Sequence, residues 1–244
     1  SDHSVFQNGK QIKPTELNRG DKIDIIDIPI LKSENTMSVK KAKLIGFFIG
    51  DGSSSYKKRN HKYNSKKSGE KNYSIFCGNF DLNNSRRELL EEFKNILQSE
   101  YGINSEINDY LRHSSVYKLQ TSNASLCKWF TENCYTSYRQ KMIPKEILNG
   151  TPEIMKSFMD GFYLADGWGD NFNEATDITQ KSKVCVAGLS HILKTLGINY
   201  RISIRKDKPN IQSLYLGIHR KNKYYKINDE KSKRKNDEIW FNVK

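Results

Sequence analysis

The stretch MDGFYLADG occupies residues 159–167, and a related stretch, LIGFFIGDG, occupies residues 44–52. Each is an apolar run, suited to a buried helix, that leads into an Asp-Gly pair. Asp-Gly is a common way to end a helix, and a single copy would need no further explanation. Because there are two copies, the elements around them decide whether the acids have a shared role.

The same order of elements surrounds both stretches. The first expected helix begins at Ser38, a suitable N-cap, and the second begins at Thr151-Pro152-Glu153, which places a capping hydroxyl before a proline and an acid. Downstream, residues 96–107 and 192–202 each end a helix at Gly-Ile-Asn and enter a strand. Chance repetition of helix caps is the alternative, but the shared order favours a duplicated unit.

Small residues recur on one face of each expected helix. Gly46 and Gly50 are four positions apart, and so are Gly161 and Ala165, so each pair shares a face. Small residues on facing surfaces let two helix backbones approach closely, although an ordinary core would also accommodate them. We therefore expect the two helices to pack side by side and in the same direction.

Such a pairing brings Asp51 and Asp166 together at the C-terminal helix ends, where the macrodipole is negative and carbonyls lack partners. Converging carboxylates repel each other, and a divalent cation would relieve that repulsion. The main-chain oxygens of Gly50 and Ala165 are possible further ligands. Hard oxygen ligands favour Mg²⁺ (or Mn²⁺) over zinc, and such an ion polarises a phosphate.

The composition indicates a polyanionic partner. The chain has 41 basic and 28 acidic residues, for a net charge of +13, which favours nucleic acid, although a basic solvated surface is the alternative. No apolar run approaches the roughly 20 residues of a membrane span, and no secretory signal is recognisable, so we expect an intracellular protein. The cysteines lack zinc spacing and are expected to be reduced, mostly in the core: Cys77, Cys127, Cys134 and Cys185.

The two stretches resemble the paired motif of the LAGLIDADG homing endonucleases in their single-chain form. The last acid of the motif falls on Asp51 and Asp166, whereas the earlier acidic position holds Ile49 and Leu164. The resemblance implies an α+β fold of two pseudo-symmetric αββαββα halves, packed through the motif helices, with antiparallel saddle sheets on double-stranded DNA. It also implies a monomer that cleaves both strands at a specific site and leaves short 3′ overhangs. Because the two halves differ in their side chains, we expect that site to be long and asymmetric.

A second resemblance concerns RQKMIPKEI at residues 139–147, which is similar to the Lys-x-Ile-Pro block of the intein-borne branch. The lysine of that block supports catalysis, so the resemblance implies that Lys141 stabilises phosphate charge or orients the attacking water. An ordinary surface lysine is the alternative. Its counterpart in the second half is expected within residues 219–226, with Lys223 preferred over Lys221.

The two ends of the chain resemble parts of an intein splicing domain. Residues 2–23 are similar to one of its blocks, with His3 on the histidine of that block, and residues 238–244 are similar to a returning strand. We expect residues 1–30 and 231–244 to be remnants of that domain, with halves at 31–150 and 151–230. Residues 3–30 and 237–244 would pair as a small β module. The sequence as given has no terminal splicing nucleophiles, so we do not expect it to splice.

The strands after each Asp-Gly pair are expected to contact DNA, with lysines on phosphates and other polar side chains at base edges. The basic stretch after Asp51 could instead become ordered only on DNA. In the second half we expect a polar hairpin over residues 171–181 and a strand whose alternate residues face a groove. The candidate DNA contacts are Lys57, Lys58, Arg59, Lys62, Asn64, Lys66, Asn173, Thr176, Thr179, Gln180, Lys181, Arg201, Ser203 and Arg205.

Three other functions fit parts of the pattern. A DNA- or RNA-binding protein of the same fold, such as an intron maturase, would not cleave; the presence of both acids favours the endonuclease. A self-splicing intein is disfavoured by the absence of terminal nucleophiles. A basic binding module without an active site would leave the paired acids unexplained.

Overall fold

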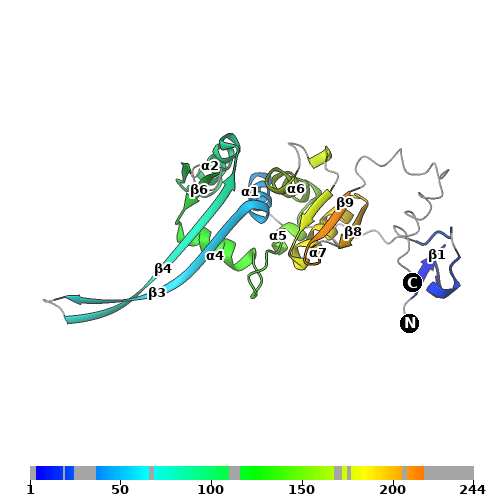
Figure 1. Ribbon diagram of the computed structural model, residues 1–244, viewed down its shortest axis with the longest axis horizontal. Coiled ribbons are helices and arrows are strands. Elements are labelled where there is room, and N and C mark those ends of the chain that lie inside the picture. Colours follow the sequence, from blue (N-terminus) through cyan, green and yellow to red (C-terminus); the bar gives the residue numbers. More distant parts are fainter. Residues whose placement is uncertain are drawn as a thin grey trace.

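The computed structural model describes residues 4–18, 20–24, 37–65, 69–109, 116–167, 172–174, 177–204 and 208–216. These residues form helices packed on antiparallel sheets (Figure 1), which confirms the expected α+β fold class. Within those ranges, no helix combines the length and apolar character that crossing a membrane requires.

The first half has the expected order of elements. It consists of α1 (Val39–Asp51), β3 (Gly52–Ser65), β4 (Gly69–Asn84), α2 (Arg87–Tyr101), β5 (Glu106–Asp109), β6 (Tyr117–Thr121) and α4 (Ala124–Asn133). The four strands form an antiparallel sheet in the order β3-β4-β6-β5. Strands β3 and β4 make a long hairpin that extends beyond the rest of the half (Figure 1). The basic stretch after Asp51 is therefore strand up to Ser65.

The second half repeats much of this order after the short helix α5 (Lys145–Leu148). It comprises α6 (Pro152–Asp166), the 3-10 turn η2 (Phe172–Glu174), β7 (Asp177–Gln180), α7 (Lys183–Thr195), β8 (Tyr200–Ile204) and β9 (Gln212–Leu216). The described strands form an antiparallel sheet in the order β7-β9-β8.

The polar hairpin expected over residues 171–181 is wrong for the described part of that segment. Residues 172–174 form a 3-10 turn, and β7 pairs with β9, a strand more than thirty residues further on. The physical reason for the different structure is an aromatic contact, which the mostly polar composition of the segment did not indicate. Phe172 is only 3% exposed, and its ring packs edge-on against Tyr163 of α6, with 6.1 Å between centroids. This contact holds the segment against the helix.

A small hairpin stands near the beginning of the chain, as the Asn-Gly pair predicts. It joins β1 (Val5–Gln7) to β2 (Lys10–Ile12) and is followed by the 3-10 turn η1 (Pro14–Glu16). Asn8 and Gly9 both have positive φ, 52° and 74°, as this type of two-residue turn requires. The Asp24 carboxylate accepts hydrogen bonds from both of their N–H groups. The expected pairing of this region with residues 237–244 lies outside the described residues.

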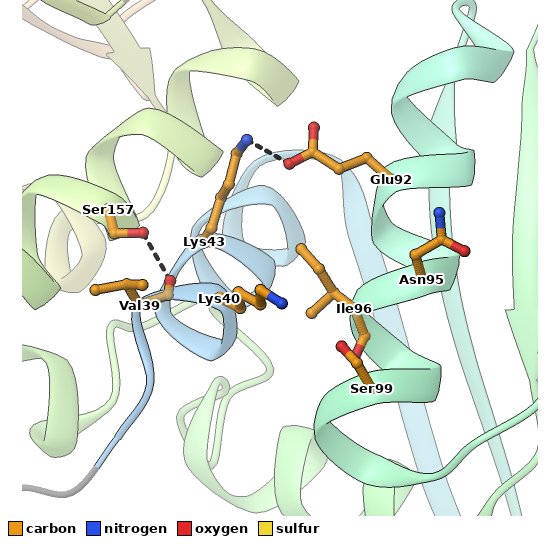
Figure 2. Close-up of a pocket in the computed structure, with 8 residues that line it drawn as sticks. All are labelled: Val39, Lys40, Lys43, Glu92, Asn95, Ile96, Ser99 and Ser157. Carbon is orange, nitrogen blue, oxygen red and sulfur yellow. Dashed lines mark hydrogen bonds and ion pairs between the residues drawn. The ribbon is translucent and has the colours of Figure 1, made fainter.

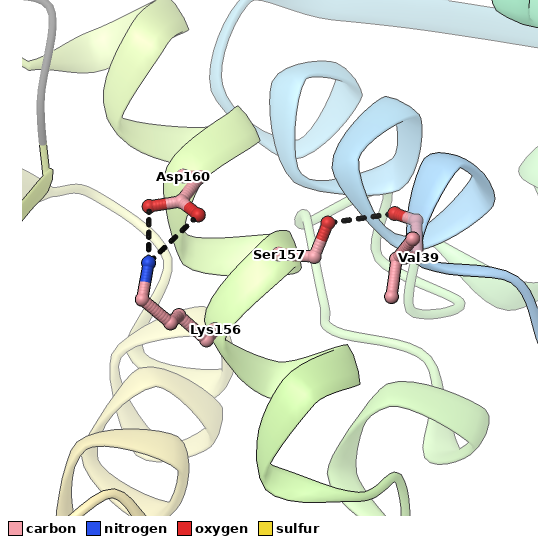
Figure 3. Close-up of polar contacts among 4 residues, drawn as sticks. All are labelled: Val39, Lys156, Ser157 and Asp160. Atoms are coloured by element: carbon pink, nitrogen blue, oxygen red, sulfur yellow. Dashed lines mark hydrogen bonds and ion pairs between the residues drawn. The ribbon is translucent and has the colours of Figure 1, made fainter.

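Helices α1 and α6 pack against each other at backbone distance. A Cβ atom on Gly161 would lie 1.9 Å from the main-chain oxygen of Lys43, and a Cβ on Gly50 would lie 2.5 Å from the Cβ of Ala165. Along both helices these contacts progress from N-terminus to C-terminus, so the helices run in the same direction, as predicted. Near their N-terminal ends the Ser157 hydroxyl donates a hydrogen bond of 2.7 Å to the carbonyl of Val39 (Figure 3).

Aromatic side chains beside this helix pair connect it to the sheet. The Phe48 ring stacks on Phe80 of β4, with 5.3 Å between centroids, and packs on Phe130 of α4 at 4.5 Å. Phe47 contacts Phe93 of α2 at 4.2 Å. The four cysteines are free, and three of them are buried, in agreement with their expected place in the core. The core thus fixes the C-terminal end of α1 relative to the strands that follow it.

Candidate active site and DNA interface

Asp51 and Asp166 are the last residues of α1 and α6, and they converge. The Cγ atom of Asp166 lies 3.5 Å from the position that a Cβ on Gly50 would occupy. Burial, and then the charge of Asp166, raise the pKa of Asp51 to about 6, against the opposing charge of Lys141. Asp166 keeps an exposed surface, but the protein packed around its carboxylate raises that pKa also.

Each acid has a different neighbour. Gln180, the last residue of β7, donates a hydrogen bond of 2.8 Å from Nε2 to Oδ2 of Asp166, which partly offsets the rise in the pKa of that acid. Asn83 of β4 donates to the main-chain oxygen of Asp51 at 3.0 Å. Gln180, expected among the DNA contacts, therefore lies in the acidic centre itself. A side-chain amide thus donates to the carboxylate in the second half and to the main-chain oxygen of the acid in the first half.

Lys141 lies at the same end of the helix pair. Its Nζ donates hydrogen bonds to the main-chain oxygens of Phe48 and Gly52, the latter at 2.6 Å, and lies 4.3 Å from the centroid of the Phe48 ring. Burial lowers the pKa of Lys141 to about 8, against the opposing effects of nearby thiols and of both acids. The ammonium group thus caps the C-terminal end of α1 and is close enough to both carboxylates to influence their charge.

The segment that carries Lys141 is fixed at several points. Lys141 forms a main-chain bridge with Tyr135, and its carbonyl accepts a hydrogen bond of 2.6 Å from Ser182, the N-cap of α7. Arg139 lies over the Tyr135 ring at 4.4 Å and donates to the carbonyl of Ser54 at 2.9 Å. Sequence reasoning missed these supporting residues. Only Ser182 carries a local signal, a serine directly before an apolar helix.

A cavity of about 450 Å³ adjoins this segment. Lys141 and Gln180 both form part of its wall, so the cavity lies beside the acidic centre. Four of its lining residues are basic, which suits an anionic group. The full lining consists of Arg139, Gln140, Lys141, Gln180, Lys181, Ser182, Lys183 and Asn210.

A second cavity, of about 380 Å³, lies between α1, α2 and α6 at the opposite end of the helix pair (Figure 2). Lys43 and Glu92 form an ion pair of 2.5 Å across it. Its wall includes Val39, the first residue of α1, which is about 18 Å from Asp51 at the usual helical rise. This cavity is therefore remote from the acids and is no part of their site.

In the first half, strand alternation sorts the candidate DNA contacts onto two faces. Lys58 pairs with Phe76, which stacks on Tyr56, and Tyr56 packs against the core, so Lys58 is on the core face of β3. Lys57 and Arg59, on either side of Lys58, therefore lie on the opposite, outer face. Lys57 and Arg59 are thus brought together, and Lys58 is separated from them. Lys62 and Asn64 belong to β3, but their side chains lie outside the described set, as does all of Lys66.

In the second half, the face opposite the core carries three of the expected contacts. Thr179 pairs with Ser213, which pairs with Ser203, and the guanidinium of Arg201 lies 4.7 Å from the centroid of the Tyr215 ring. Asn173, in η2, and Lys181, after β7, are exposed. Thr176, Arg205 and Lys223 lie outside the described residues.

The donor set of the centre suits a hard cation. Among the described residues no group of three or more His, Cys, Asp or Glu side chains is placed to hold a metal ion. The candidate ligands are therefore the two carboxylates and main-chain oxygens such as those of Gly50 and Ala165. The last carbonyls of a helix lack partners within the helix. An all-oxygen set of this kind fits Mg²⁺ or Mn²⁺ rather than zinc.

Fold and site together define a protein of two repeated halves that share one acidic centre at the ends of paired helices. The family model for the LAGLIDADG-like domain matches residues 38–135 and 153–238, one segment in each half. The chain belongs to this family.

Solved structures with a similar fold include mesophilic variants of the homing endonuclease I-DmoI. They are 19% identical, with a TM-score of 0.51, over 74% of this chain and 85% of theirs. A structure of I-DmoI in complex with DNA and Mn is 17% identical, with a TM-score of 0.50, over 82% of this chain and 95% of that one. At these identities the similarity establishes the fold.

Curated proteins with similar sequences are much longer. A DNA polymerase of Acanthamoeba polyphaga mimivirus is 33% identical over 225 residues, which is 87% of this chain and 12% of the polymerase. A component of the A-type ATP synthase of Pyrococcus abyssi (strain GE5 / Orsay) is 23% identical over 199 residues, which is 79% of this chain and 16% of that component. The chain thus spans less than a fifth of the length of either relative.

Proposed function

We propose that this protein is a site-specific endonuclease that hydrolyses both strands of a long, asymmetric double-stranded DNA target and leaves short 3′ overhangs. The observation that carries the proposal is the convergence of Asp51 and Asp166 at the ends of two paired helices. Each of these helices leads toward a sheet whose outer face carries charged or hydroxyl side chains, such as Lys57 and Arg59 in the first half and Thr179 and Ser203 in the second. Membership of the LAGLIDADG-like family and the net charge of +13 support it.

Asp51 and Asp166, with the main-chain oxygens of Gly50 and Ala165, would hold Mg²⁺ or Mn²⁺. Such an ion, when bound, polarises a phosphate and lowers the pKa of a water molecule. The raised pKa of Asp51 supports this assignment, because a cation removes the repulsion that contributes to it.

We assign Lys141 to the stabilisation of phosphate charge or the orientation of the attacking water, because its ammonium group is close enough to both acids to influence their pKa. Gln180 helps to keep Asp166 ionised through its hydrogen bond. We keep Lys223 as the proposed counterpart of Lys141 in the second half.

The DNA would lie on the outer faces of the two sheets. Lys57 and Arg59 in the first half, and Thr179, Arg201 and Ser203 in the second, would contact it. The basic cavity beside Lys141 suits a backbone phosphate close to the scissile bonds. Because the two halves present different side chains, the target would be asymmetric.

Cleavage assays with two isosteric variants test the proposal. The target is first selected from a randomised DNA library by cleavage in Mg²⁺. Asp51→Asn and Asp166→Asn should each lower the cleavage rate by about 10²–10³-fold, because the neutral amide no longer provides a charged ligand for the cation. DNA affinity should stay nearly unchanged. Asp160→Asn, which removes an acid that is ion-paired with Lys156 on α6 (Figure 3), is the matched control.

Full activity in both Asn variants would refute the assignment of the acids. A wild-type protein that binds selected DNA but never cleaves it would instead support the non-cleaving alternative, a binding protein or maturase of the same fold.

We further propose that the chain is of the intein-borne type. A common block within a DNA polymerase and an ATP synthase component, two unrelated proteins, is expected of a mobile insertion. The β1–β2 hairpin precedes the family match, which begins at residue 38, and this supports a separate segment at residues 1–30. We keep the proposed halves at 31–150 and 151–230, with 231–244 returning to the first segment, although the family match extends to residue 238. Sequencing the reading frame on both sides should reveal the two parts of one host protein; an unrelated or absent flank would contradict this.

A further inference from the structure

We propose that Asp81 is a positioning residue that fixes the amide groups of Asn79 and Gln120 in one orientation, and thereby sets the base preference of the first half close to the cleavage centre. The inference rests on the proposed endonuclease function and extends it to the question of how the target is read.

The place of Asp81 in the sheet is unusual for an acid. It is 6% exposed and lies between Phe80 and Leu82 of β4, which are fully buried on the core side. Alternation along the strand therefore directs Asp81 to the outer face, the face of Lys57 and Arg59. Its partner on β3 is Ser53, two residues after Asp51, so the site is about 7 Å along the strand from the acidic centre.

Neutral donors surround the Asp81 carboxylate. Oδ2 accepts hydrogen bonds from Nδ2 of Asn79 at 2.5 Å and from the hydroxyl of Ser53 at 3.2 Å, and Oδ1 accepts from Nε2 of Gln120 at 2.8 Å. The chain of bonds continues, since Oε1 of Gln120 accepts from Nδ2 of Asn108 on β5 at 2.9 Å. The network crosses all four strands of the sheet.

The chemistry of Asp81 gives this network a direction. An ionised carboxylate only accepts hydrogen bonds, whereas an amide both donates and accepts and can be turned over. The amide nitrogens of Asn79 and Gln120 must therefore face Asp81, and Gln120 in turn fixes Asn108. Asn79, which is exposed, is left with its oxygen and one N–H directed elsewhere.

An amide group held in one orientation on this face can recognise a base by hydrogen bonding. An asparagine pairs with adenine through its oxygen and one N–H, and the pairing requires one orientation of the amide. Asp81 supplies that orientation before DNA binds, so little ordering remains to be done on binding. An acid on a DNA-facing sheet repels phosphates, so a role in general affinity would be better served by a neutral or basic residue.

The second half has a related acid in a different setting. Asp177 precedes the buried Ile178 just as Asp81 precedes Leu82, but its neighbour across the sheet is Tyr215, beside Arg201, instead of a glutamine. Within the described strands of the second half, an aromatic residue thus takes the cross-strand position that Gln120 holds beside Asp81. The effect of the Asp81 network on base preference should be confined to one side of the target.

The test compares base preference in Asp81→Asn, Asn79→Ala and wild type. Each protein is assayed for cleavage against the selected target and against all single-base changes of it. Asp81→Asn replaces the acceptor with a group of equal size that also donates, so the amide of Asn79 is free to turn. We expect the preference for the best base to fall about 5–100-fold at one or two positions near the centre of one half-site. Asn79→Ala should relax the same positions.

The control is Glu132→Gln, which removes one negative charge from an exposed residue of α4, the helix that packs on the opposite face of the same sheet. It should keep the wild-type preference at every position. Thermal unfolding verifies that each variant is folded. If Asp81→Asn does not fold, Asn79→Ala still tests the inference, because Asn79 is exposed and its truncation should not prevent folding.

Two results would overturn the inference: an unchanged preference profile in folded Asp81→Asn, or relaxation by Asn79→Ala at other positions. If Asp81→Asn cleaves every target more slowly but keeps the wild-type preference profile, the inference is also overturned, because Asp81 would then have only a structural role. Failure of the wild type to cleave any DNA is a separate outcome that contradicts the proposed function itself.

Discussion

At the level of single residues, the centre depends on two acids and one lysine whose charged forms the fold disfavours. Burial raises the pKa of Asp51 to about 6 and lowers that of Lys141 to about 8. Both shifts have the same origin, since removal from water penalises whichever form is charged. Perturbed groups of this kind are typical of functional sites.

These shifts predict a bell-shaped dependence of cleavage on pH. Activity that needs ionised Asp51 is lost as the pH falls through about 6, and a bound cation would shift this acid limb to lower pH. Activity that needs charged Lys141 is lost as the pH rises through about 8. Single-turnover cleavage measured from pH 5 to 10 at fixed Mg²⁺ checks this, with a maximum expected near pH 7.

Lys141→Arg separates the two limbs of that profile. The guanidinium stays protonated over this range, so the alkaline limb should disappear whatever the maximal rate of the variant. If the alkaline limb persists near pH 8 in Lys141→Arg, a group other than Lys141 is responsible for it.

At the level of elements, the close packing of α1 on α6 is what brings the acids together. The approach is possible because Gly161 has no side chain to meet the carbonyl of Lys43. A different kind of contact surrounds Gly188 of α7, where a Cβ would lie 3.0 Å from the end of the flexible Ile143 side chain. The two glycines thus form a matched pair for testing the helix interface.

Gly161→Ala should destabilise the protein by about 1–3 kcal/mol, because the new methyl group meets backbone that cannot move without separating the helices. Gly188→Ala should change stability by less than about 1 kcal/mol, because Ile143 can adjust and alanine favours the helix. Thermal or urea unfolding measures both. Equal stability of the two variants would contradict the close approach of the helix backbones.

At the level of the whole molecule, charge and asymmetry determine how the protein meets its target. The net charge of +13 belongs to the chain as a whole, whereas the proposed DNA contacts differ between the halves. In the proposed function, charge would therefore supply affinity for any DNA, and the outer sheet faces would supply the choice among sequences.

DNA affinity should consequently fall steeply with salt. If about 6–10 phosphates are contacted, the association constant should drop about 10³–10⁵-fold between about 50 and 200 mM salt. Fluorescence anisotropy with the selected target and with an unrelated duplex measures the slope. Similar slopes for the two duplexes are expected, and a slope near zero would show that phosphate contacts are not the source of affinity.

Local signals in the sequence predicted the framework of this protein. The two Asp-Gly helices, their capping residues and their small residues are all encoded within short windows, because helix caps and helix periodicity involve neighbours only three or four positions apart. Duplication of that pattern was enough to predict the parallel helix pair and the meeting of Asp51 with Asp166.

Long-range contacts decided the rest. No local spacing reveals that Phe172 packs on Tyr163, that Gln180 bonds to Asp166, or that Ser182 donates a hydrogen bond to the carbonyl of Lys141. The Asp81 network likewise needs four strands in register. Strand pairing and side-chain contact depend on which distant segments meet, so these features are determined only when the chain has folded.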